Sequence, residues 1–150
     1  MRGAALIAAT LACASCRAAP SEPPKRVTLR RVSGASFELV PSAQQHPLCL
    51  AYTVSRKGVI RQLTMSARDQ SFECPANEPI GGRAYRVPEG EGPVKVYVLF
   101  TSAPVSAASV SQQLLDAADH QHLTAMDLRL PGNATLDALE FEPLTDAGAP

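Results

Sequence analysis

Four cysteines carry the chemistry that is easiest to assess in this chain of 150 residues. Cys13 and Cys16 lie in an N-terminal run poor in charge, whereas Cys49 and Cys74 lie in the body of the chain. In an exported protein two body cysteines most often pair, and this bridge would close a loop of about 26 residues, worth roughly 3.5 kcal/mol. A redox pair or two metal thiolates are the alternatives, but neither body cysteine belongs to a CxxC motif. We therefore expect a structural Cys49–Cys74 disulfide.

Two histidines, His120 and His122, form the one sequence cluster that resembles metal ligands, together with Asp116 and Asp119 just before them. The apolar pattern places them at the end of a helix. Residues two apart on a helix point about 200° away from each other, so they do not bind the same ion. A helix C-terminus also favours histidine electrostatically. We therefore expect surface histidines, with no bound metal or cofactor.

The sequence contains no familiar catalytic motif. No serine lies in a G-x-S-x-G or S-x-x-K arrangement. The glycines at 81–82 and 90–92 lack the strand-then-helix context of a phosphate-binding loop, and Pro93 removes a backbone donor there. We therefore expect no enzymatic activity.

The N-terminus indicates export. Met1 and Arg2 supply one positive charge, and residues 3–12 (GAALIAATLA) are small or apolar throughout, which is the pattern of a secretory signal. The run is too short to cross a bilayer, which needs about 20 apolar residues. Residues 1–12 are therefore predicted to be a signal peptide.

The end of this run, Thr10-Leu11-Ala12-Cys13, resembles the lipobox of bacterial lipoproteins, although Thr10 stands where leucine is usual. The resemblance implies that Cys13 is lipidated, and Cys16 is the alternative acceptor. Lipidation of this kind attaches several acyl chains to the cysteine. They would suffice for stable membrane anchoring, which takes about two. Ala14 stands in place of the aspartate associated with inner-membrane retention, so the resemblance implies the outer membrane, with the domain facing the periplasm.

Composition divides the remaining chain into three parts. Residues 13–25 would be the lipidated cysteine and a Pro-rich tether, 26–145 a single β-rich domain, and 146–150 a disordered tail. Without residues 1–12 the chain has 13 basic and 14 acidic residues, a balance that argues against a nucleic-acid partner.

The body of the chain is rich in strand patterns. A hairpin is predicted from 48–54 and 59–64, because Gly58 suits the positive φ of a bulged turn. Residues 94–101 (VKVYVLFT) are apolar on both faces, which is typical of a central strand covered on both sides. The other predicted strands are 27–32, 36–40, 83–87, and a second hairpin of 126–130 with 139–141.

One helix is predicted late in the chain. Apolar residues recur at helical spacing from Ala107 to Ala118, giving a helix of about 12 to 15 residues that begins at Ser106 or Ser109. We therefore predict a mainly β, antiparallel sandwich-like domain with one late amphipathic helix. The alternative is an open α+β sheet backed by that helix.

Residues 48–105 also resemble a β-domain of unknown function found in exported and signalling proteins of Gram-negative bacteria. The likeness rests on the 48–64 hairpin, on Tyr85-Arg86-Val87-Pro88, and on the strand of 94–101 between Gly92-Pro93 and a Ser-x-x-Pro exit, here Ser102-Ala103-Pro104-Val105. It implies a β-domain and assigns no activity.

The sequence thus predicts a non-enzymatic exported lipoprotein, held at the membrane by its lipid, whose domain binds a protein partner in the envelope. Two alternatives stay open at this point. One is an accessory lipoprotein that binds a small ligand or a metal, which would involve His120 and His122. The other is a cryptic hydrolase, for which export is the sole support.

Overall fold

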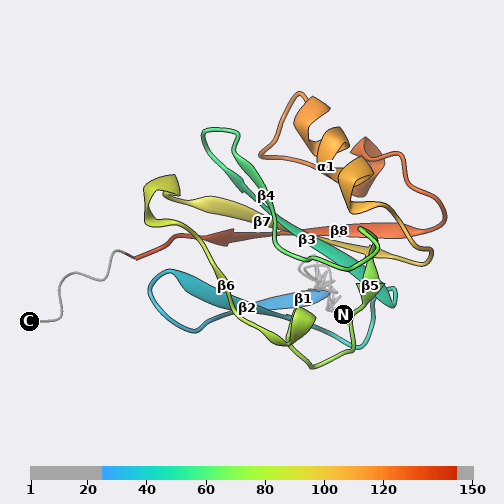
Figure 1. The fold of residues 1–150 in the computed structure, drawn as a ribbon, viewed down its shortest axis with the longest axis horizontal. Coiled ribbons are helices and arrows are strands. Elements are labelled where there is room, and N and C mark those ends of the chain that lie inside the picture. Colours follow the sequence, from blue (N-terminus) through green and yellow to red (C-terminus); the bar gives the residue numbers. More distant parts are fainter. Residues whose placement is uncertain (1–24, 145–150) are drawn as a thin grey trace, which may run out of the picture.

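Strands make up most of the secondary structure in the computed structural model, which describes residues 25–144 (Figure 1). They form two antiparallel sheets. The smaller sheet has the order β1-β2-β6, from β1 (Val27–Arg31), β2 (Ser36–Pro41) and β6 (Tyr85–Arg86). The larger sheet has the order β4-β3-β7-β8, with β5 also paired to β3; its strands are β3 (Leu48–Ser55), β4 (Ile60–Gln62), β5 (Phe72–Glu73), β7 (Val94–Thr101) and β8 (Ala134–Phe141).

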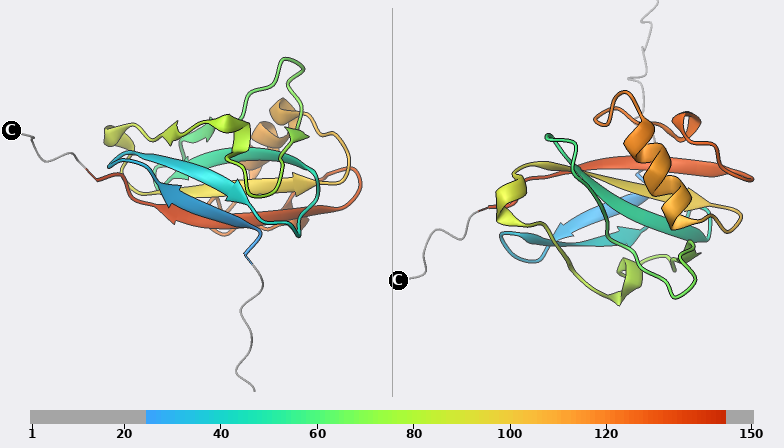
Figure 2. Two further views of the ribbon diagram at one scale, coloured as in Figure 1. Left: turned by 90° about the horizontal axis from the view of Figure 1, so that it is seen from below. Right: turned by 45° about the horizontal axis from the view of Figure 1, so that its top comes forward.

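The two sheets face each other, and the helical elements that follow β7 cover the opposite side of the larger sheet (Figures 1 and 2). The α-helix is α1 (Ala107–Asp116), and the 3-10 helices are η1 (Ile80–Gly82), η2 (Glu89–Glu91) and η3 (Ala125–Asp127). The predicted mainly β, sandwich-like architecture with one late helix is therefore confirmed. Within residues 25–144, no helix has both the length and the apolar character that a membrane span requires.

The hairpin of β3 and β4 forms as predicted. The two strands pair antiparallel, and Gly58 adopts a φ of 79° in the turn. The N–H of Ser55 donates to the carbonyl of Val59 at 2.9 Å, and the N–H of Gly58 donates to the carbonyl of Ser55 at 3.0 Å. A side chain at position 58 would be strained at this φ, so the glycine permits the turn.

Strand β7 is the centre of the larger sheet, as its two apolar faces predict. It lies between β3 and β8. Val98 and Phe100 point into the cluster between the two sheets, whereas Tyr97 and Leu99 point into the cluster under α1. All four side chains are fully buried. The continuous apolar run therefore reflects burial on both sides of the strand.

Helix α1 begins one residue after Ser106, whose Oγ accepts the N–H of Ser109 at 3.3 Å. Of the two predicted caps, Ser106 is therefore the one used. The helix has 10 residues, fewer than predicted, because Ala117 already has extended backbone angles. Its apolar stripe packs on the larger sheet, with Val110 and Leu114 buried.

The predicted strand at 126–130, and with it the second hairpin, is wrong. Residues 125–127 form η3, which is closed by a capping box: the N–H and the hydroxyl of Thr124 both donate to the Asp127 carboxylate, at 2.7 and 2.8 Å. Within the apolar alternation, Leu128 is buried but Met126 is 95% exposed, so these residues do not share a buried face. The last strand, β8, is longer than the predicted 139–141 and pairs with β7 instead.

The first and last strands, β1 and β8, lie next to each other in different sheets and run in the same direction. Near their beginnings, the N–H and the guanidinium of Arg26 bind the Asp137 carboxylate at 3.0 and 3.2 Å. Near their ends, the Arg31 guanidinium donates to the Glu142 carbonyl at 2.8 Å. Both contacts join residues 111 positions apart, the constant separation that parallel strands produce. Side chains therefore close this side of the sandwich.

Candidate functional site

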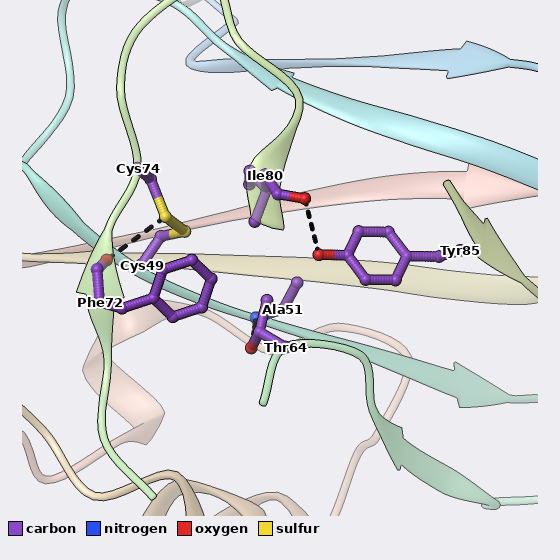
Figure 3. Close-up of a disulfide and its surroundings, with 7 residues drawn as sticks. All are labelled: Cys49, Ala51, Thr64, Phe72, Cys74, Ile80 and Tyr85. Atoms are coloured by element: carbon purple, nitrogen blue, oxygen red, sulfur yellow. Dashed lines mark hydrogen bonds between the residues drawn. A yellow bond between two sulfur atoms is a disulfide. The ribbon is translucent and has the colours of Figure 1, made fainter. Parts of the chain in front are cut away.

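The two body cysteines form the predicted disulfide (Figure 3). Cys49 lies on β3 and Cys74 directly after β5, with their Cα atoms 5.9 Å apart, inside the usual range for a disulfide. The pairing of β5 with β3 places Phe72 opposite Cys49 and so brings Cys74 into reach. Both sulfur-bearing residues are buried in the cluster between the sheets. The bridge therefore fixes the long connection after β4 to the sheet, and its burial suits a structural role.

Further hydrogen bonds hold the same connection against the core (Figure 3). The hydroxyl of Tyr85 donates to the carbonyl of Ile80 at 2.8 Å, and burial raises the pKa of this phenol. The N–H of Ala51 donates to the hydroxyl of Thr64 at 3.0 Å. Buried polar groups are thus paired on both sides of the disulfide, so this part of the molecule is built as a fixed support.

The two predicted candidate ligands, His120 and His122, lie in the loop that follows α1, because the helix has already ended at Asp116. His122 Nδ1 lies 2.8 Å from the Asp119 carboxylate, whereas His120 Nε2 lies 3.3 Å from a different group, the carbonyl of Leu115. The N–H of Gln121 and the side chain of His122 lower the pKa of Asp119. The two imidazoles therefore have separate partners, and residues 25–144 contain no group of three or more His, Cys, Asp or Glu side chains arranged to hold a metal.

This loop is held to the sheet by polar side chains that the sequence patterns did not single out. The Tyr97 hydroxyl donates to the carbonyl of His120 at 2.9 Å and accepts the N–H of Leu123 at 3.3 Å. Lys95 Nζ donates to the carbonyl of Gln121 at 2.6 Å. Burial raises the pKa of Tyr97. One signal was present in the sequence, since a tyrosine inside an apolar strand usually needs a hydrogen-bond partner for its hydroxyl.

A small open pocket adjoins this loop at the end of the sandwich where β7 begins. Its volume is about 230 Å³, and Gln121 forms part of its wall. The pocket combines two cations, Arg56 and Lys95, with two carboxylates, Glu140 and Glu142. Val94 and Phe141, which are both buried, also lie in its lining. Such a mixture of charges suits a small ligand that carries both signs.

The helical layer also exposes two large apolar side chains. Leu115 on α1 is 55% exposed, and Met126 on η3 is 95% exposed. Both elements are fixed in place: the Gln113 side chain of α1 bonds to the backbone of Arg129, which follows η3, through its amide nitrogen at 3.4 Å and its oxygen at 2.5 Å. The layer therefore presents apolar groups to solvent on a rigid support.

The predicted signal peptide, both candidate lipidation sites (Cys13 and Cys16), the tether up to residue 24 and the tail of 146–150 lie outside the described residues. Comparison of the chain with models of protein families, with curated proteins and with solved structures finds no match.

Proposed function

We propose that this chain is an exported lipoprotein of the bacterial envelope that acts by binding another protein and has no enzymatic activity of its own. The observation that carries the exported location is the buried Cys49–Cys74 disulfide. Structural disulfides form and persist in oxidising compartments such as the periplasm and are rare in the cytosol. The disulfide and the signal-like N-terminus therefore support the same location independently.

The lipobox-like sequence supports a membrane anchor at Cys13, with Cys16 as the alternative. The first described strand begins at Val27, so a short polar and Pro-rich segment separates Cys13 from the fold. Such a segment is a semi-extended spacer. The domain would stand close to the membrane surface, in this proposal that of the outer membrane on its periplasmic side.

The helical layer is the surface that we assign to the protein partner. Leu115 and Met126 expose large apolar side chains on supports that hydrogen bonds hold in place. Methionine adapts its shape to different surfaces, which suits it to protein contacts. A partner that covers these two side chains would bury apolar area at little cost in ordering the domain.

The anchor is tested by fractionating cells that express single variants. Cys13→Ala is expected to move the protein from the membrane to the soluble periplasmic fraction, whereas Cys16→Ala is expected to stay in the membrane. The reverse result would assign the anchor to Cys16. Recovery of both variants in the membrane would refute lipid anchoring at either cysteine.

The partner is tested by chemical cross-linking in intact envelopes, followed by capture of this chain and mass spectrometry. We expect a reproducible cross-linked protein that is lost in the variants Leu115→Asp and Met126→Asp. Val32→Asp is the matched control, because Val32 is similarly exposed (56%) but lies outside the helical layer. If the wild-type chain captures no reproducible protein, or if Val32→Asp has the same effect, the assignment fails.

The pocket beside the His120–His122 loop supports a second candidate, an accessory lipoprotein that binds a small ligand or a metal. Arg56 and Lys95 would hold an anionic group, and Glu140 a cationic one. Calorimetry with zinc, copper and small zwitterions such as amino acids tests this function. Heat of binding that disappears in Lys95→Met would favour it over protein binding.

A further inference from the structure

A hollow of about 350 Å³ opens in the helical layer, where the chain leaves α1. Its apolar lining comes from Ala117, Ala118 and Leu123, and Leu123 is buried. The space exists because α1 ends at Asp116 and is followed by two alanines, whose side chains are too small to fill it. The hollow has room for a long side chain of a partner.

Two carboxylates share this lining with His122: those of Asp119 and Asp127. The N–H of Gln121 and the side chain of His122 lower the pKa of Asp119, and the N–H and hydroxyl of Thr124 lower the pKa of Asp127. The negative charge of Asp119 acts on the pKa of Asp127 in the upward direction, so the two carboxylates lie near each other. Both are therefore ionised at neutral pH, and a positive charge placed beside them would relieve their repulsion.

The described chain does not supply that positive charge. No lysine or arginine within residues 25–144 forms an ion pair with Asp119 or Asp127. The helical layer, residues 106–130, carries these two aspartates and Asp116, but Arg129 is its one lysine or arginine. Residues 25–144 as a whole carry equal numbers of basic and acidic residues. The layer is therefore a negative surface on a chain of balanced charge.

The two exposed apolar side chains of the layer adjoin the hollow. Leu115 comes two positions before Ala117, and Met126 directly precedes Asp127. Helix α1 and η3 lie on the same side of the larger sheet (Figure 2), and the Tyr97 hydroxyl holds the N–H of Leu123 at 3.3 Å. A partner therefore meets apolar groups and a negative hollow on one rigid surface, which lowers the cost of ordering it on binding.

We propose that the partner of the helical layer presents a basic side chain, arginine or lysine, flanked by apolar residues, and that this basic side chain enters the hollow. Its aliphatic stem would contact the two alanines and Leu123, while its charged head pairs with Asp119 and Asp127. The flanking apolar residues would cover Leu115 and Met126. This inference rests on the proposed function, because it names the chemistry of the partner assigned to the same surface.

Photo-cross-linking in permeabilised envelopes tests the proposal on the full chain. A photoreactive benzoylphenylalanine replaces Met126, which is 95% exposed, and captures a protein that lies against η3. In this background Asp119→Asn/Asp127→Asn removes both charges but keeps oxygens that accept the bonds from Gln121 and Thr124. The yield of the cross-linked product is expected to fall roughly fivefold or more, the loss expected for two ion pairs.

Glu73→Gln/Glu78→Gln is the matched control. Both glutamates are exposed and lie in the connection between β4 and β6, outside the helical layer. The control removes the same charge from the molecule, so its cross-linking yield should equal that of the unaltered background. An unchanged melting temperature and an intact Cys49–Cys74 disulfide show that each variant is folded.

Two competition measurements examine the charge of the partner directly. The peptide acetyl-Leu-Arg-Leu-amide, added at millimolar concentration, should reduce the cross-link, whereas the peptide with neutral citrulline in place of arginine should not. Raising the salt from about 0.1 M to about 1 M should weaken capture when both aspartates are present and hardly change it in Asp119→Asn/Asp127→Asn, because salt screens exposed charges.

The failures of the two proposals are distinguishable. If Asp119→Asn/Asp127→Asn captures the partner as well as the background does, if the glutamine control loses as much, or if both peptides compete equally, the basic side chain is wrong and a partner on the helical layer remains. If position 126 captures no protein at all, the helical layer is not the partner surface, and this inference fails with it.

Discussion

Phe100→Ala is the change that most directly tests the architecture. Phe100 is fully buried at the centre of β7, within the cluster between the two sheets. Its neighbours in the adjacent strands are Cys49 and Thr135, both much smaller side chains. Cys49 is also tied by the disulfide, so the surrounding strands have little freedom to collapse into the space that the ring leaves. The cavity should therefore persist.

Replacing a buried phenylalanine by alanine costs about 3–5 kcal/mol, and the persistent cavity favours the upper end of this range. Domains of this size have total stabilities of about 5–15 kcal/mol, so the variant should be close to unfolding at 37 °C. Urea unfolding under non-reducing conditions measures the change in the free energy of unfolding at constant m-value. Met126→Ala removes an exposed apolar side chain and is the control, expected within about 0.5 kcal/mol of wild type. A melting temperature of Phe100→Ala within a degree or two of wild type would show that β7 is not the core strand.

Three further changes give separate tests. Removal of the disulfide in Cys49→Ala/Cys74→Ala should lower the free energy of unfolding by about 3.5 kcal/mol, and mass spectrometry of the non-reduced wild-type chain should find these cysteines linked. Tyr97→Phe should cost about 1–3 kcal/mol and speed hydrogen exchange at Leu123, because it leaves that buried N–H without its acceptor; unchanged exchange would contradict the contact. Burial raises the pKa of Tyr52 to about 12, above its unfolded value, so stability should be constant below pH 10 and fall between pH 10 and 12. Tyr52 accounts for about 2 kcal/mol of that loss in the free energy of unfolding. Urea titrations across this pH range should therefore show a smaller fall for Tyr52→Phe than for the wild type.

The predictable parts of the fold were those that local physics determines. The β3–β4 hairpin follows from the single glycine that its turn needs, and the position of β7 follows from apolar residues on both faces. The disulfide followed from the number of cysteines, because only two remained in the body of the chain. Each of these inferences needed a short stretch of sequence or a simple count.

The end of the domain was not predictable in this way. The alternation at Met126, Leu128 and Leu130 looks like a strand, yet the capping box of Thr124 with Asp127 starts a 3-10 turn there. Strand β8 contains alanines of low β propensity, and its full length follows from its register with β7, which no local pattern shows.

The side chains that hold the loop of His120 and His122 could not be identified from the sequence, because they act through contacts between distant segments. The strand pattern of β7 gives Lys95 no role, but Lys95 Nζ holds the backbone of Gln121 in the loop after α1. Its loss should therefore loosen the loop that carries His120 and His122. The histidines themselves could be named from the sequence, whereas their separate partners could not, since the end of α1 decides where each ring lies.

The arrangement of β7 between β3 and β8 has a consequence for how the chain folds as it is made. The most apolar strand keeps one bare edge until the last described strand has been synthesised, and β1 also lacks its contact at Asp137 until then. Pairings of such long sequence separation form slowly, and incomplete intermediates with open strand edges tend to aggregate. We therefore expect the domain to complete its fold only after β8 has been made. Chains that stop short of Phe141 should depend on chaperones or proteases rather than settle into a smaller stable fold.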